Sequence, residues 1–142
     1  MRVDQILQSK GSKVHTISAE ATVAEAVRAL NAYNIGALVV TEANGRLAGI
    51  LSERDVVRRL VGSKAAVLTQ GVKACMTPDP ITCAPDDTTE RLMGLMTTHR
   101  IRHLPVVKNG KLIGLISIGD VVKSRIEEVE HEAAALRDYI AS

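Results

Sequence analysis

Two identical Ser-x-x-Asp motifs are the residues of this sequence best suited to chemistry. Ser52 and Asp55 form one, and Ser117 and Asp120 form the other. A carboxylate can accept hydrogen bonds from both vicinal hydroxyls of a ribose. A serine at a helix N-cap leaves backbone N–H groups pointing outward, and the positive end of the helix dipole there attracts phosphate. The motifs are therefore candidate ribose and phosphate sites, although the same pattern also stabilises a helix start as a plain cap.

A glycine precedes each motif by three residues, at Gly49 and Gly114. A cap alone does not require it, so the duplicated glycine favours the ligand-site interpretation. The positive charge that a phosphate needs is also present. The candidates are Arg54, Arg100, Arg102 and His103, the last three in the cationic stretch His99–His103. A solvated basic loop is the alternative interpretation of that stretch.

The remaining reactive side chains give weaker signals. Cys75 and Cys83 match no common metal-ligand spacing, so reduced thiols in a cytoplasmic protein are the simplest interpretation. His15 and His131 have no paired cysteines, and we interpret them as surface histidines. The sequence thus predicts no metal site.

Composition excludes several classes of protein. The 142 residues include 46% hydrophobic residues, two Tyr and no Trp or Phe, and the formal net charge is +2. Proteins that stack single-stranded nucleic acid need aromatic side chains, and duplex binders need a larger basic excess. No apolar run reaches the roughly 18 residues of a membrane-spanning helix. We therefore expect a cytoplasmic globular protein that binds neither nucleic acid nor membrane.

An internal repeat organises the chain. Asn44, Gly45, Ser52 and Asp55 recur 65 positions later, at Asn109, Gly110, Ser117 and Asp120. Upstream of the Asn-Gly pair the offset is 66, as in Thr22 and Thr88, so the first copy carries one extra residue near that turn. Asn-Gly favours a tight hairpin turn, where an insertion is tolerated.

Each copy predicts the same elements. An extended piece (14–17 or 80–83) leads to a helix capped by Thr22 or Thr88, then to two apolar runs that form a hairpin (37–41 with 47–51, and 104–107 with 112–116). Ser-x-x-Asp then opens a last helix. Residues 3–7 resemble 72–76, so each repeat is expected to have its own lead-in helix. A β-α-β-β-α unit of about 60 residues is marginally stable alone, so the two should pack together.

With these residues in place, the chain resembles a tandem pair of CBS domains, also called a Bateman module. The resemblance rests on residues 49–55, 114–120 and 99–106. It implies an α/β (α+β) fold of two β-α-β-β-α repeats related by pseudo-two-fold symmetry, with a long C-terminal helix added here. The expected boundaries are 1–70 for the first repeat, 71–124 for the second and 125–142 for the amphipathic C-terminal helix.

The resemblance also implies a ligand. Paired CBS domains bind adenine nucleotides in clefts between the repeats, so AMP is the first expectation, and ATP, ADP, NAD(H) or S-adenosylmethionine are alternatives, with no metal required. The ribose and phosphate side would use Ser52, Arg54, Asp55, Ser117, Asp120, Arg100, Arg102 and His103. The adenine would lie near Thr16, Ile17, Ala37, Leu38, Thr82, Cys83, Leu104 and Pro105.

The expected function is a regulatory sensor that signals nucleotide binding to an effector protein. A scaffold module with vestigial clefts is the alternative, because the first copy has no basic cluster. An enzyme is not expected, since the sequence has neither a Walker loop nor Gly-x-Gly-x-x-Gly. After Asp120 an a/d heptad pattern runs through Val122, Ile126, Val129, Ala133, Leu136 and Ile140. It packs either on its own module or on another chain, and the resemblance implies a homodimer.

Overall fold

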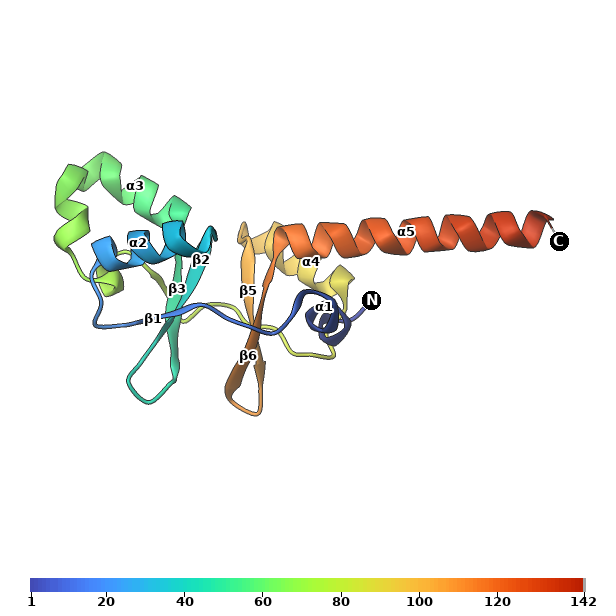
Figure 1. Ribbon diagram of the computed structural model, residues 1–142, viewed down its shortest axis with the longest axis horizontal. Coiled ribbons are helices and arrows are strands. Elements are labelled where there is room, and N and C mark those ends of the chain that lie inside the picture. Colours follow the sequence, from blue (N-terminus) through green and yellow to red (C-terminus); the bar gives the residue numbers. More distant parts are fainter. Residues whose placement is uncertain (142) are drawn as a thin grey trace. The chain divides into compact units, whose positions relative to one another are not determined.

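The computed structural model describes residues 1–141, except for the side chains of residues 63–65. The chain forms two compact units, Val14–Ile81 (the first unit) and Met1–Lys13 with Thr82–Ser142 (the second unit). Both contain helices and strands, so the predicted mixed α/β fold is confirmed. Figure 1 shows the elements of each unit.

The first unit is built around one sheet. Its strands are β1 (Thr16–Ser18), β2 (Ala37–Thr41), β3 (Leu47–Ser52) and β4 (Thr77–Pro78), in the order β1-β2-β3-β4. β1 pairs with β2 in parallel, and the other pairings are antiparallel. The helices are α2 (Val23–Tyr33) and α3 (Glu53–Ser63), followed by the 3₁₀ turns η1 (Lys64–Thr69) and η2 (Val72–Ala74). Leu38, Val40 and Leu51 are fully buried in the core beneath the helices.

The second unit repeats this plan with fewer paired strands. β5 (His103–Lys108) and β6 (Lys111–Ser117) form the hairpin, and the helices are α1 (Val3–Lys10), α4 (Thr89–His99) and α5 (Ile118–Ala141). The extended piece predicted at 80–83 pairs only at Cys83, whose N–H donates to Pro105 and whose carbonyl accepts from Val107, both at 2.9 Å. Its core includes Val3, Leu92, Leu104, Val106 and Ile116, all fully buried.

The predicted caps and turns form as the residue types require. The Thr22 and Thr88 hydroxyls each accept from the N–H three residues later, at 3.2 Å. Asn109 and Gly110 both have positive φ (52° and 76°), as a two-residue hairpin turn demands. Thr41 pairs with Leu47 in the first hairpin, so its connection is longer, and this accommodates the extra residue of the first copy.

The lead-in segments pack differently from the sequence prediction. Helix α1 precedes the first repeat in the chain but belongs to the second unit, where the Val3 N–H donates to the backbone carbonyl of Asp87 at 2.9 Å. The segment after η1 takes the matching place in the first unit, because the Val72 N–H donates to Ala21, also at 2.9 Å. Each repeat thus has a lead-in segment, but it comes from the part of the chain that precedes the other repeat.

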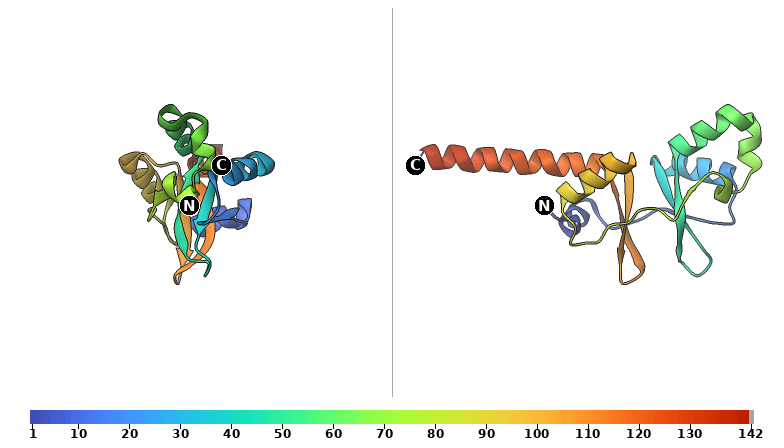
Figure 2. Two further views of the ribbon diagram at one scale, coloured as in Figure 1. Left: turned by 90° about the vertical axis from the view of Figure 1, so that its left-hand side faces the viewer. Right: turned by 180° about the vertical axis from the view of Figure 1, so that it is seen from behind.

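The last helix of the second unit is much longer than its counterpart. α5 has 24 residues and α3 has 11, as the C-terminal heptad pattern indicates. α5 starts at the end of β6, contacts α4 and continues past α4 and α1 (Figures 1 and 2). Val121 and Ser124 are buried at its base. Its C-terminal half is exposed, with Leu136 at 60% and Ile140 at 75% of full accessibility.

Candidate functional site

The first Ser-x-x-Asp motif forms a reciprocal cap at the start of α3. The Asp55 N–H donates to the Ser52 hydroxyl at 3.2 Å, and Asp55 Oδ2 accepts from the Ser52 N–H at 2.8 Å and from its hydroxyl at 3.0 Å. β3 delivers Ser52 to this place, where it pairs with Ala37 of β2. The hydrogen bond from the Asp55 N–H confirms the predicted N-cap at Ser52.

The second motif forms the same cap with an added cation. The Asp120 N–H donates to the Ser117 hydroxyl at 3.2 Å, and Asp120 Oδ2 accepts from the Ser117 N–H at 2.9 Å. Lys10 Nζ lies 2.7 Å from the same Oδ2 and also donates to the Leu115 carbonyl at 2.9 Å. Sequence analysis did not find Lys10, because it lies on α1, 110 positions away from Asp120.

The lysine changes the electrostatics of Asp120. Partial burial alone would raise the pKa of this carboxyl group. The hydrogen bond from Lys10, the Ser117 backbone N–H and the Lys10 charge outweigh that effect, so the pKa of Asp120 is lowered from its ordinary value. Asp120 is therefore a carboxylate over the whole neutral range, as an acceptor of ribose hydroxyls must be.

Both helix starts keep hydrogen-bonding capacity. In the described part of the chain, Oδ1 of Asp55 and Oδ1 of Asp120 accept no hydrogen bond, because all contacts of the caps go to Oδ2. The N–H groups of Arg54 and Gly119, the second residues of α3 and α5, also meet no acceptor among these residues. A free carboxylate oxygen next to a free helix-start N–H can bind a hydroxyl and an anionic oxygen of one ligand.

The predicted cationic residues of the second unit lie close to the start of α5. The Arg102 carbonyl accepts from the Ile118 N–H at 2.8 Å, and His103 pairs directly with Ser117 across the hairpin. Arg100 ends α4 in the left-handed conformation (φ 54°). The side chains of Arg100 and Arg102 are exposed. The backbone therefore brings Arg102, His103, Ser117 and Asp120 to one end of the hairpin.

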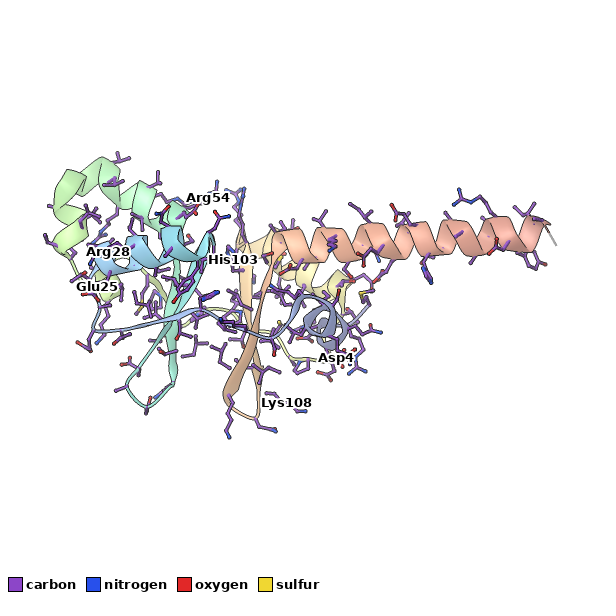
Figure 3. The ribbon with its side chains drawn as sticks, viewed as in Figure 1. Asp4, Glu25, Arg28, Arg54, His103 and Lys108 are labelled. Atoms are coloured by element: carbon purple, nitrogen blue, oxygen red, sulfur yellow. The ribbon has the colours of Figure 1, made fainter. Side chains whose placement is uncertain are left out.

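The first unit has the same geometry without these charges. Asn34 ends α2 with φ 52°, and the Gly36 carbonyl accepts from the Glu53 N–H at 3.0 Å. These two residues and Ala37 stand where the second unit has Arg100, Arg102 and His103. Arg54 is the predicted cation of this unit, and it is exposed near the start of α3 (Figure 3).

The predicted adenine-pocket residues occupy equivalent places in the two units. Thr16 and Thr82 are exposed, and Ile17 is half-buried. Ala37, Leu38, Cys83, Leu104 and Pro105 are buried in the strands. The two threonines and the half-buried Ile17 are thus the accessible residues of this set.

The two cysteines are poor nucleophiles. Burial raises the pKa of the Cys83 thiol to about 12, and the neighbouring Asp87 carboxylate adds to the effect. Burial also raises the pKa of Cys75, whose thiol lies 3.5 Å from the Asp55 carbonyl. Both cysteines are free thiols, and only a very small fraction of Cys83 ionises at neutral pH.

The duplicated glycines have a packing explanation. A Cβ on Gly49 would lie 2.6 Å from the Thr77 carbonyl oxygen, and one on Gly114 would lie 2.7 Å from Leu7 Cδ2. Each glycine lets a segment approach the hairpin closely, the paired edge strand β4 in the first unit and helix α1 in the second. The glycines therefore no longer weigh in favour of a ligand site over a plain cap.

Two hollows lie on the surface of the described residues, and one of them is at the start of α5. One of about 510 Å³ is lined by Arg102 and by residues of α5 from Ile118 to Glu127. Another, of about 550 Å³, lies at the first hairpin turn beside Asp79. Neither is lined by the predicted adenine-pocket residues.

Within residues 1–141 no three His, Cys, Asp or Glu side chains are grouped to hold a metal ion, and no helix there is long and apolar enough to cross a membrane.

Two repeats with the same hairpin, the same Ser-x-x-Asp cap and a lead-in segment each define a tandem CBS-domain module. The family model of the CBS domain matches residues 5–62 and 72–127, so the chain belongs to the CBS-domain proteins.

Individual relatives cover most of the chain. It is 36% identical to the "CBS domain-containing protein CBSX3, mitochondrial" of Arabidopsis thaliana, over 97% of this chain and 71% of that protein. The crystal structure of the CBS-domain containing protein ATU1752 from Agrobacterium tumefaciens is 46% identical, with a TM-score of 0.86 over 88% of this chain and 99% of that one. The CBS domain pair of protein MJ0100, solved with 5-methylthioadenosine and S-adenosyl-L-methionine, shares the fold at 22% identity, with a TM-score of 0.77 over 87% and 98% of the two chains.

Proposed function

We propose that this CBS-domain protein is a regulatory module that binds an adenine nucleotide at its Ser-x-x-Asp helix starts and signals the bound state to an effector protein. The observation that carries the proposal is the pair of half-buried carboxylates, Asp55 and Asp120, each with one oxygen fixed by a cap and the other open. A plain cap needs only the fixed oxygen. The open oxygen suits the vicinal hydroxyls of a ribose.

The two helix starts would prefer ligands with different numbers of phosphates. Arg100 and Arg102 carry positive charges in the second unit, His103 lies beside them, and a group of cations suits a ligand with several phosphates. The first unit offers Arg54 and the free N–H groups of α3, which suit one phosphate. Both helix starts offer an open carboxylate oxygen and a free N–H, which match one ribose and one phosphate. AMP is therefore the first ligand to test, and ATP, ADP, NAD(H) and S-adenosylmethionine follow. Asp55, Asp120 and the cations act by binding, and the proposal assigns no catalytic residue.

The adenine base would be held without aromatic stacking. The chain has no Trp or Phe, and its two Tyr are outside the predicted pocket. The base would rest on the half-buried side chain of Ile17 and bond to the backbone beside the exposed Thr16 and Thr82. The adenine-containing ligands of the MJ0100 domain pair support this class of ligand for the fold.

The test is thermal unfolding with each of these nucleotides at millimolar concentration. A ligand that binds only the folded protein stabilises it by about 2.7 kcal/mol at a hundredfold excess over Kd. We expect a rise in Tm with at least one nucleotide and none with adenine-free phosphate at the same ionic strength. No rise with any of them would overturn the proposal.

One observation favours a second candidate function. Lys10 already pairs with Asp120 Oδ2, as a structural cap would, and the first unit has no basic turn. A scaffold module whose nucleotide sites are vestigial would show both features. Absorbance of the freshly purified protein near 260 nm separates the two functions, because a chain with so few aromatic residues absorbs little and any co-purified nucleotide would be obvious.

A further inference from the structure

The last helix presents an apolar seam that its own unit leaves uncovered. The seam consists of Val122, Ile126, Val129, Ala133, Leu136 and Ile140. Val122 is 45% exposed, Val129 56% and Ile140 75%. Buried contacts of α5 lie on another side of the helix, at Val121 and Ser124. The seam continues past the end of α4 and α1 (Figures 1 and 2), where the second unit has nothing to cover it.

The spacing of the seam is that of a coiled coil. Its residues follow at steps of four, three, four, three and four, so Ile126, Ala133 and Ile140 take the a positions and Val122, Val129 and Leu136 the d positions. From Val122 to Ile140 the helix is about 27 Å long at 1.5 Å per residue. An exposed apolar stripe of this length is unusual on a monomer and indicates an interaction surface.

The charges beside the seam select both the partner and its direction. In a parallel pair of identical helices, each g residue meets the e residue five positions later on the other helix. Here Arg125 would meet Glu130 of the partner subunit, and Glu132 would meet Arg137 of the partner subunit. Both pairs are attractive. Glu132 and Arg137 form no ion pair within the described chain, whereas Arg125 also binds Glu90 and Glu128.

The antiparallel arrangement is disfavoured by the same residues. The antiparallel register that uses the whole seam places Val129 against Ala133 of the partner subunit. Glu130 and Glu132 would then each face their own copies, and Lys123 would face Arg137 of the partner subunit. All three contacts join like charges, which are destabilising next to a seam.

We propose that the α5 seam docks a second copy of this chain as a parallel, in-register coiled coil. The pairing gives a geometry to the homodimer that the CBS resemblance implies, and it does not depend on nucleotide binding. An antiparallel copy would need a different charge pattern beside the seam.

Cysteine cross-linking of the full chain without nucleotide tests the pairing. Val129→Cys places a thiol at a d position, which faces its own copy within disulfide reach only in a parallel, in-register pair. His131→Cys, on the opposite side of the same helix, is the matched control, and both carry Cys75→Ser. We expect Val129→Cys to form disulfide dimers roughly tenfold faster than His131→Cys or more, because only its thiols are held within bonding distance.

Three results would overturn the proposal. They are equal rates for the two variants, faster linkage through Glu130→Cys than through Val129→Cys, and a dimer by light scattering that Val129→Cys does not link. The last would leave a homodimer in place but through another surface.

Charge reversal tests the pairing a second way. Glu132→Arg or Arg137→Glu alone should slow Val129→Cys cross-linking several-fold, because each creates a like-charge contact. The double reversal should restore the rate. A rate unchanged by both single reversals contradicts the parallel register.

Discussion

The helix starts of α3 and α5 are the same local structure in different surroundings. Ser52 caps Asp55 as Ser117 caps Asp120, with equal N–H to hydroxyl distances of 3.2 Å. Of these two carboxylates, Asp120 alone has a lysine beside it among the side chains that the structure describes, and its unit carries the basic turn at Arg100 and Arg102. Duplication thus preserved the backbone while the charges diverged.

The comparison also separates packing from function. The glycine before each motif serves the close approach of β4 or α1, so both units need it for folding alike. The cations differ between the units although the fold does not require them to. Under the proposed function, the different cations would set the ligand preference of each unit, whereas the shared glycines serve packing.

The largest expected effect is on stability, from the glycines. Gly49→Ala places a methyl group 2.6 Å from the Thr77 carbonyl oxygen, and backbone has to move to relieve the clash. Gly114→Ala meets the end of the Leu7 side chain, which can rotate. We expect a loss of about 2–3 kcal/mol of unfolding free energy for Gly49→Ala and about 1 kcal/mol for Gly114→Ala, measured by urea denaturation.

Gly94→Ala is the control for this pair. Gly94 lies in α4 with open space around it, so alanine should stabilise the helix by up to about 1 kcal/mol. Equal losses of unfolding free energy for Gly49→Ala and Gly114→Ala would show that the Leu7 side chain yields no more easily than the β4 backbone. That result would contradict the expected difference between the two units.

A smaller effect is expected on nucleotide preference. Arg100→Gln with Arg102→Gln removes two charges from the second unit and leaves the caps intact. Affinity for ATP should fall roughly tenfold or more, with a smaller fall for AMP, because two charge-assisted contacts to phosphate are lost. Isothermal titration at two salt concentrations measures this, with Lys108→Gln, an exposed lysine at the hairpin turn, as the control. Equal losses for ATP and AMP would contradict the assignment of the basic turn to phosphates.

The smallest expected effect concerns Lys10. Lys10→Met should lower the unfolding free energy at pH 7 by about 1 kcal/mol or less, because the pair is partly exposed. The folded pKa of Asp120 lies below its ordinary value of 3.8, so this contribution is present above that value and is lost as the pH falls through the lowered pKa.

Urea denaturation at pH 7 and near pH 3 checks the Lys10 effect. The difference between wild type and Lys10→Met should shrink at the lower pH. Lys13→Met is the control, since Lys13 is an exposed lysine just after α1. A difference that does not change with pH would mean that Lys10 acts through the Leu115 carbonyl and not through the charge of Asp120.

Much of the fold could be predicted because its signals are local. The repeat, the threonine caps, both hairpins and the heptads of α5 follow from residues close together in the sequence. The packing of α1 on the second unit could not be predicted, because residues 3–7 resemble 72–76 and the sequence alone does not say which repeat each contacts. Lys10 was missed for the same reason, and the role of Gly114 depends on that packing as well.

The backbone arrangement of the candidate site could also be predicted from the sequence. The register that brings His103 beside Ser117 follows from the hairpin, and so does the approach of Arg102 to the start of α5. The burial of Leu38 and Leu104 was not foreseen, because a strand position next to a site and a core position have the same apolar pattern. Side-chain exposure is a property of the packed unit and not of the strand.

Isothermal titration of AMP into wild type, Asp55→Asn and Asp120→Asn tests the central claim most directly. Asparagine keeps the shape of the cap but removes the negative charge, and the melting temperature without ligand shows whether each variant is folded. The account predicts that wild type binds AMP and that each substitution removes the binding of one helix start, leaving the other. Binding that is unchanged in both folded variants would contradict it.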